Sequence, residues 1–191
     1  MNRSFSFLEK FSANKVIYGV NTGFGPMAQY RIQPEDQLQL QYNLIRSHAS
    51  GTGNALAPIH VKAAILARLN TLALGKSGVN ISVIQLMKEL INRDITPLIF
   101  AHGGVGASGD LVQLAHLALI LIGEGEVFYK GERKLTKEVF EIEGLQPIEV
   151  KIREGLGLMN GTSVMTGIGI VNVLLADKLV DFSLQASCMI N

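Results

Sequence analysis

Apolar residues recur every three or four positions along most of the chain, and polar or glycine-rich joints separate these segments. Such spacing is typical of amphipathic helices and predicts a mainly α-helical chain. We expect one helix to begin with Pro34, Glu35 and Asp36 as its first turn, because proline has no N–H to leave unpaired there and acids favour the helix N-terminus. The other expected helices cover residues 4–12, 58–74, 81–92 and 110–122, and a long one follows Gly161.

Strand character is limited to short segments. Residues 126–129 and 132–135 flank Lys130 and Gly131 and predict a small β-hairpin. Residues 15–20 are predicted to be extended, and a turn-rich loop follows over residues 21–25. No repeat divides the chain, so residues 1–191 are treated as a single region.

Charge and cysteine content limit the possible partners. Seventeen basic and sixteen acidic residues give a net charge of +1 without a basic stripe, so we expect neither nucleic acid nor an anionic membrane as a partner. The most apolar run, residues 164–176, is shorter than the ~20 residues of a membrane crossing. The lone cysteine, Cys188, fits a reducing compartment, and we expect a cytoplasmic protein. His60, His102 and His116 have no ligand spacing, so no metal site is expected.

The composition is apolar for an independent domain. Only 17% of the residues are charged and the mean hydropathy is positive. A chain of this kind exposes apolar surface unless something covers it. We therefore expect a fragment of a longer chain or a subunit with large interfaces, and the lack of a helix-stop signal over residues 184–191 favours the fragment.

The glycine-rich segment at residues 103–110 allows several interpretations. Gly104, Gly106 and Gly109 match the G-x-G-x-x-G pattern of a nucleotide-binding domain, but the flanking segments are helical and Asp110 puts an acid where a pyrophosphate should bind. A G-x-S-x-G nucleophile elbow is less favoured, because it needs glycine at position 110. A flexible helix cap is the simplest alternative.

Backbone chemistry offers another interpretation of the same segment. In Ala107-Ser108-Gly109, the unhindered Gly109 nitrogen can attack the Ala107 carbonyl carbon if the surrounding glycines bend the loop sharply. Closure of the ring and loss of two waters, one of them from the Ser108 side chain, would produce 4-methylidene-imidazole-5-one. This group is a strong electrophile and needs no external cofactor.

Three motifs carry a resemblance to a known family. Residues 18–25 (Tyr-Gly-Val-Asn-Thr-Gly-Phe-Gly) resemble the tyrosine loop of the histidine, phenylalanine and tyrosine ammonia-lyases. Residues 103–111 resemble the electrophile signature of that family, and residues 154–162 (Glu-Gly-Leu-Gly-Leu-Met-Asn-Gly-Thr) resemble its third active-site segment. The resemblance implies the N-terminal part of a helical-bundle lyase with an aspartase/fumarase-like fold.

The resemblance also implies roles for individual residues. Tyr18 is expected to be the base that takes a proton from the substrate β-carbon, and Asn160 to hydrogen-bond the oxygen of the electrophile. Asn160 could equally serve as an N-cap of the helix after Gly161. Gly25 and Asp110 are expected to support the site, Asp110 by polarising groups during dehydration.

Ser47 and His48 lie where the family recognises the substrate side chain. The pair resembles histidine ammonia-lyases, which convert histidine to trans-urocanate; a tyrosine ammonia-lyase, which gives p-coumarate, is the alternative, because imidazole can also bind a phenol. The resemblance leaves open whether the amine or the aromatic ring attacks the electrophile. It further implies a homotetramer and carboxylate-binding residues later in the chain, so residues 1–191 alone are expected to be inactive.

Overall fold

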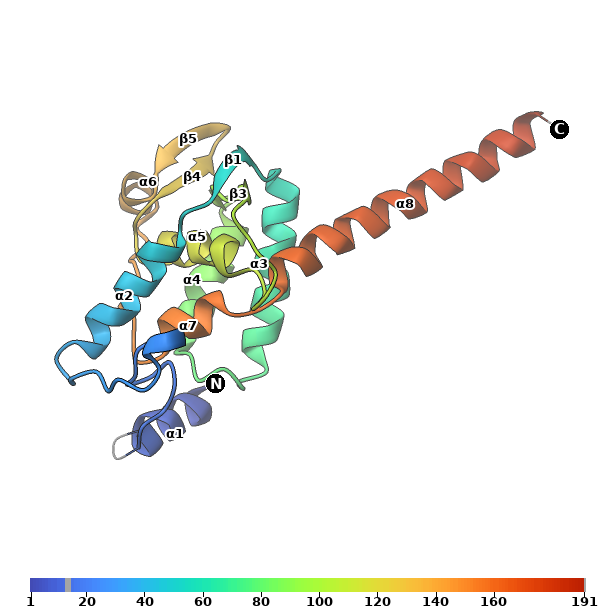
Figure 1. Cartoon of the computed structure of the whole chain (residues 1–191). Coiled ribbons are helices and arrows are strands. Elements are labelled where there is room, and N and C mark those ends of the chain that lie inside the picture. Colours follow the sequence, from blue (N-terminus) through green and yellow to red (C-terminus); the bar gives the residue numbers. More distant parts are fainter. Residues whose placement is uncertain (13–14, 191) are drawn as a thin grey trace.

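The computed structural model describes residues 1–12 and 15–190, and helices dominate it, as the sequence predicts (Figure 1). The helices are α1 (Asn2–Ser12), α2 (Gln37–His48), α3 (Pro58–Ala73), α4 (Ile81–Asn92), α5 (Leu111–Leu121), α6 (Thr136–Glu143), α7 (Glu154–Met159) and α8 (Ser163–Ile190), with a short 3-10 turn, η1 (Gly25–Met27).

Helix α5 forms the centre of the core. It contacts α2, α4, α7 and α8, and eight of its eleven residues are buried, including His116 and Gln113. This confirms the burial predicted from its nearly uniform apolar character. Figure 1 shows α2 and α3 on opposite sides of α5, so the helix that follows the glycine-rich segment is enclosed by the other helices of the body.

Two small antiparallel sheets accompany the helices. The predicted hairpin is confirmed as β4 (Glu126–Tyr129) and β5 (Glu132–Leu135), and Lys130 and Gly131 both have positive φ in the turn, as a type I′ turn requires. β4 also pairs with β2 (Thr96–Pro97), while β1 (Thr52–Ala55) pairs with β3 (Phe100–His102). Strands β1, β2 and β3 were not predicted, because two to four residues are too few to show an alternating pattern.

The structure corrects two predictions near the N-terminus. Lys15 forms a bend and residues 18–20 form a turn, where an extended segment over residues 15–20 was predicted. The Asn21 side chain explains the difference: its Oδ1 accepts from the Ile17 N–H at 2.8 Å and its Nδ2 donates to the Lys15 carbonyl at 2.6 Å. Pro34, Glu35 and Asp36 form a turn that precedes α2, whereas they were expected to be its first turn.

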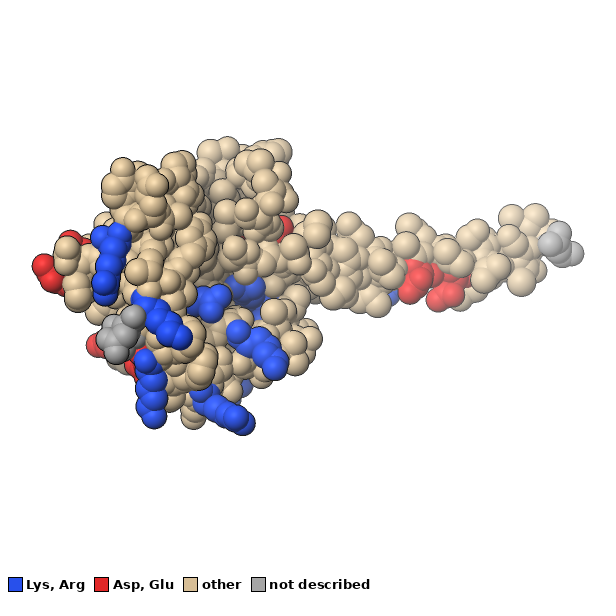
Figure 2. Space-filling model, turned by 60° about the horizontal axis from the view of Figure 1, so that its bottom comes forward, with Lys and Arg blue, Asp and Glu red and all other residues tan. Residues whose placement is uncertain are grey.

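Helix α8 projects from the body as a long arm (Figure 1). Its first turns pack on α3, where Gly167 lies against the backbone of Ala64, and no residue after Val171 is buried in the described part of the helix. Figure 2 shows an arm mostly free of charged residues. The helix has 28 residues and is long and apolar enough to cross a membrane. The core helix of a soluble protein can have the same length and composition. Because the helix is longer than the apolar run 164–176, the length of that run does not exclude a membrane crossing.

Gly123 lets the chain turn sharply after α5. Its φ is +83°, and a Cβ there would lie 2.7 Å from Cγ of Pro147. The Ile148 N–H donates to the Leu121 carbonyl at 2.9 Å, so this contact helps to fix the segment that leads into α7.

We predict that Gly123→Ala is more destabilising than Gly131→Ala, which serves as the matched control. Gly131 has almost the same φ, +82°, but a Cβ there would meet no atom within 4 Å. The positive φ alone should cost ~1–2 kcal/mol in both variants. The contact with Pro147 should cost Gly123→Ala a further ~1–3 kcal/mol. Urea unfolding measures both values, and equal losses would contradict the prediction.

Candidate active site

The glycine-rich loop and the segment after α7 meet through their backbones. Gly109 and Gly161 form a parallel β-bridge, and the Asp110 N–H donates to the Gly161 carbonyl at 2.7 Å. A Cβ on Gly109 would collide with that carbonyl oxygen, so only glycine fits at position 109. This contact joins the two motifs that were expected to hold the electrophile and Asn160.

The loop itself is sharply bent and open. Gly103, Gly106 and Gly109 have φ values of +122°, +76° and +91°, which residues with a side chain rarely adopt. Residues 103–108 are exposed, and Val105 is 90% exposed. The bend and the glycine required at position 109 fit the backbone condensation proposed for Ala107-Ser108-Gly109.

Asp110 connects the loop to α8. Its Oδ2 accepts from the backbone N–H groups of Val164 at 2.8 Å and Met165 at 3.0 Å. A carboxylate in this position satisfies otherwise unpaired N–H groups at the positive end of the helix. Asp110, and not Asn160, is therefore the cap of α8. Asn160 ends α7 instead, where its N–H donates to the Leu156 carbonyl.

Tyr18 lies on a loop that packs against α7. A Cβ on Gly19 would approach Cδ2 of Leu156 to 2.5 Å, so the loop depends on glycine to contact the helix this closely. The Gly25 N–H donates to the phenolic oxygen of Tyr18 at 3.3 Å, and the Phe24 ring packs edge-on to the tyrosine. Tyr18 remains 53% exposed.

Ser47 and His48 end α2, and both polar groups contact one carbonyl. The Leu44 oxygen lies 3.1 Å from Ser47 Oγ and 3.0 Å from His48 Nδ1. If Nδ1 donates to this carbonyl, the proton of a neutral imidazole is on Nδ1, and Nε2 keeps a free lone pair. The geometry thus favours a hydrogen-bond acceptor at the tip of His48.

Comparison with known proteins identifies the chain. The family model of aromatic amino acid lyases matches residues 1–191. The chain belongs to this family of carbon–nitrogen lyases. A dinucleotide-binding domain, the distant alternative, would require a parallel βαβ unit, and both sheets in the described residues are antiparallel.

Individual relatives point to particular members of the lyase family. The chain is 46% identical over 172 residues to a histidine ammonia-lyase of Myxococcus xanthus, covering 90% of this chain and 34% of the relative. It resembles the crystal structure of histidine ammonia-lyase from Trypanosoma cruzi with a TM-score of 0.85 and 32% identity, covering 93% of this chain and 35% of that one. It resembles tyrosine aminomutase from Streptomyces globisporus with a TM-score of 0.81 and 40% identity, covering 87% and 31%. The chain therefore spans about a third of these relatives.

Buried polar side chains support the candidate site in this member of the lyase family. Arg68 Nη2 donates to the Gly157 carbonyl at 2.6 Å, and burial lowers the pKa of Arg68 to about 10 while Asp110 opposes that shift. Gln41 Oε1 accepts from the Gly155 N–H at 3.1 Å. Neither residue was predicted to support the site. Arg68 did carry a signal in the sequence, because it is a charged residue beside the apolar positions of the 58–74 helix.

Glu154 fixes the start of α7. Its two carboxylate oxygens accept from the N–H groups of Asn80 at 2.6 Å and Lys151 at 2.7 Å. Burial raises the pKa of Glu154, and the two backbone donors act in the opposite direction. Together, Glu154, Gln41 and Arg68 hold the short helix that lies between the Tyr18 loop and Asn160.

The predicted site residues do not line one common cavity. A cavity of about 370 Å³ lies between the glycine-rich loop and α8, and one of about 360 Å³ is lined by Asn160 and Arg68. Tyr18, Ser47 and His48 line neither of them. The described residues include no group of three or more His, Cys, Asp or Glu side chains arranged to hold a metal ion.

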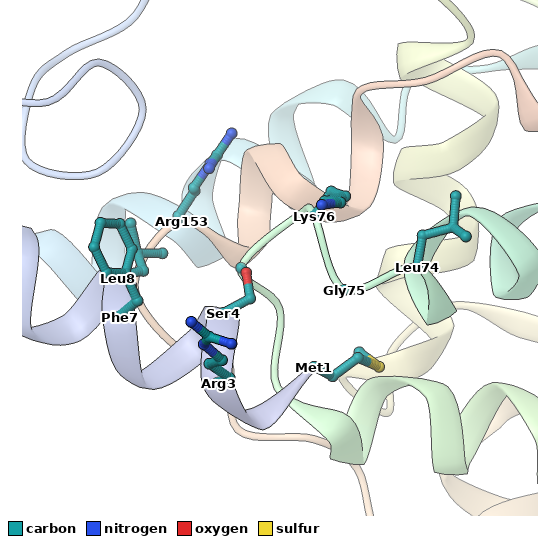
Figure 3. Close-up of a pocket in the computed structure, with 10 residues that line it drawn as sticks. Met1, Arg3, Ser4, Phe7, Leu8, Leu74, Gly75, Lys76 and Arg153 are labelled. Atoms are coloured by element: carbon teal, nitrogen blue, oxygen red, sulfur yellow. The ribbon is translucent and has the colours of Figure 1, made fainter.

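Another cavity is remote from the predicted residues. It has a volume of about 770 Å³ and lies between α1 and the turn after α3, with Arg3, Lys76 and Arg153 among its lining residues (Figure 3). Lys and Arg side chains also gather on the face brought forward in Figure 2. None of the predicted site residues lines this cavity, so its size does not make it the candidate active site.

His116 links α5 to the segment after His48. It is buried, its Nε2 accepts from the Gly51 N–H at 3.0 Å, and its ring packs edge-on against Phe100. Burial lowers the pKa of His116. The neutral ring is the form that can accept this hydrogen bond, because a protonated imidazole has no free lone pair.

We predict that His116 makes stability depend on pH. Its folded pKa lies below the unfolded value of about 6.5, so the unfolded chain takes up a proton that the folded chain does not. The stabilisation is present above about pH 6.5 and is lost as the pH falls towards the folded pKa, by at most ~1.4 kcal/mol per pH unit. Urea unfolding of the wild type and His116→Gln across this range measures the effect. A constant difference between the two proteins would contradict it.

Proposed function

We propose that the full-length protein eliminates ammonia from an aromatic L-amino acid, and that the substrate is histidine, which gives trans-urocanate. The observation that supports this most is the backbone bridge between Gly109 and Gly161. It joins the proposed electrophile segment, Ala107-Ser108-Gly109, to the segment that carries Asn160. Similarity to the Myxococcus xanthus histidine ammonia-lyase favours histidine.

The proposed electrophile is made from the chain itself. 4-Methylidene-imidazole-5-one would supply an electrophilic carbon that makes the substrate amine a better leaving group. The glycine at position 109 and the bends at Gly103 and Gly106 allow the backbone approach that its formation needs. Asn160 would donate from its amide to the oxygen of the ring and stabilise charge that develops there.

Tyr18 is proposed as the base. Its phenolic oxygen would take the proton from the substrate β-carbon, and ammonia would leave from the neighbouring carbon. The Gly25 N–H already donates to this oxygen, and this hydrogen bond would persist while the phenolic oxygen takes the proton. This contact gives Gly25 a supporting role, and Asp110 supports the site by holding the loop against α8.

His48 is proposed to recognise the substrate side chain. An acceptor at Nε2 suits the N–H of a substrate imidazole, and Ser47 Oγ, 3.1 Å from the Nδ1 that faces the Leu44 carbonyl, would help to fix the ring. The same acceptor suits a phenol hydroxyl. Tyrosine, with p-coumarate as its product, therefore remains the second candidate, and the chain is 40% identical to a tyrosine aminomutase.

We propose that the rest of the protein completes the site in a cytoplasmic homotetramer. Tyr18 and the glycine-rich loop are exposed in this chain, and α8 carries a long apolar surface. Such surfaces are typical of subunit interfaces. Residues that bind the substrate carboxylate would come from the remaining two thirds of the protein, so residues 1–191 alone should release no ammonia.

We predict that the full-length wild type has a mass lowered by two waters in the peptide containing residues 107–109, and that Ser108→Ala lacks this loss and releases no ammonia. Alanine has no hydroxyl to eliminate, so the methylidene cannot form. Mass spectrometry of the digested protein and an ammonia assay measure both effects. Ser82→Ala, on α4, is the control and should match the wild type. Ammonia release from a protein with an unmodified peptide would refute the proposal.

We predict that His48→Leu lowers kcat/KM for histidine by about 10- to 100-fold, because the substrate N–H loses its acceptor. Phenylalanine has no polar group on its ring, so its kcat/KM should change much less in the same variant. Rates with histidine, tyrosine and phenylalanine, measured on wild type and variant, give the comparison. An equal loss on histidine and phenylalanine would show that His48 does not read the side chain.

A further inference from the structure

Arg68 is a buried cation beneath the candidate active site. It lies on α3, and only 3% of the residue is exposed. Charged side chains are rarely buried to this extent unless they have a partner. Its Nη2 donates to the Gly157 carbonyl at 2.6 Å, whereas its Nε has no partner in the described part of the chain. Gly157 precedes Asn160 by about one helical turn.

Arg68 also contacts the chain on the other side of Asn160. A Cβ on Gly161 would collide with Nη1 of Arg68, so the guanidinium fills the space that a side chain at position 161 would need. Both Arg68 and Asn160 line the cavity of about 360 Å³. One rigid, planar group therefore restrains the residues before and after the proposed electrophile-binding amide.

Asp110 restrains Gly161 from the glycine-rich loop. Its N–H donates to the Gly161 carbonyl at 2.7 Å, while its side chain binds the first turn of α8. The negative charge of Asp110 also favours the charged form of Arg68, and a guanidinium with a pKa of about 10 is cationic at neutral pH. Gly161 thus lies between a cation on α3 and the loop that carries Ser108.

We propose that Arg68 is a positioning residue for the elimination reaction: by binding Gly157 and filling the space beside Gly161, it sets where the Asn160 amide lies relative to residues 107–109. This inference rests on the proposed function, because only there does Asn160 act on the electrophile. Lysine keeps the charge but has a single ammonium group, which cannot make both contacts in the same geometry.

The first test compares kcat and KM of full-length wild type, Arg68→Lys and Arg68→Gln. Loss of an aligned donor lowers kcat by about 100-fold or more, so a displaced Asn160 should lower kcat by about tenfold or more in Arg68→Gln. Arg68→Lys should keep more activity, and KM should change by less than about threefold in both variants. Unchanged kcat, or a loss confined to KM, overturns the proposal.

Arg93→Gln is the matched control. Arg93 donates through Nη1 to a backbone carbonyl, that of Glu143, at the same distance of 2.6 Å, but it lies at the end of α4. Its substitution removes a similar bond remote from Asn160, together with ion pairs to Glu89 and Glu143, and should leave kcat unchanged. A loss equal to that of Arg68→Gln would show that any such bond matters only for stability, which also overturns the proposal.

The second test asks whether Arg68 acts through Asn160. Arg68→Lys is introduced into the wild type and into Asn160→Ala, and kcat is measured for all four proteins. If Arg68 positions Asn160, Arg68→Lys should lower kcat in the wild type and have almost no further effect on kcat in Asn160→Ala. The same fold-loss in both backgrounds indicates a purely structural role and overturns the proposal. If Arg68→Gln does not fold, this cycle alone decides.

The wild type separates the two hypotheses. A wild type without the two-water mass loss or without ammonia release refutes the proposed function, and the role of Arg68 with it. A wild type that has both, together with Arg68 variants that match it, refutes only the role of Arg68.

Discussion

The candidate active site depends on one contact between two stretches of backbone. Gly109 and Gly161 are 52 positions apart in the sequence. Their bridge and the Asp110 N–H bring the glycine-rich loop before α5 against the segment between α7 and α8. Position 109 does not tolerate a side chain, because the backbone of Gly161 occupies the space, and a side chain at position 161 would displace Arg68. The groups that meet are peptide groups, and side chains on both sides hold them in place: Asp110 binds the first turn of α8, and Arg68 lies against Gly161.

Helix α7 transmits this constraint to the rest of the site. Its six residues are too few to be stable in isolation, and it is held by buried polar groups from three other segments. Gln41 binds from α2, Arg68 from α3, and Glu154 binds the Asn80 N–H before α4. The Tyr18 loop packs on the same helix through Gly19. The proposed base and the proposed electrophile segment are thus both positioned by α7, although no described side-chain contact joins them directly.

Much of this arrangement could be predicted from the sequence, and the successes have a common cause. Ile81–Asn92 and the hairpin strands begin and end where the pattern predicted, because local spacing and local turn residues determine them. The bonds of Arg68 and His116 escaped prediction, since each joins residues more than sixty positions apart. The turns near Tyr18 escaped it for another reason: the Asn21 side chain binds the backbone of Lys15 and Ile17 and overrides the strand propensity of the segment. The roles of the candidate residues remain predictions drawn from motifs.

The cap on α8 has a mechanical consequence. A 28-residue helix is about 40 Å long, and it is anchored in this chain only through its first turns. A small tilt about that anchor displaces the outer end by many ångströms, and fixing the outer end suppresses the tilt. Since the Asp110 carboxylate binds the same first turns, any partner that clamps the distal half of α8 also immobilises the glycine-rich loop at its base.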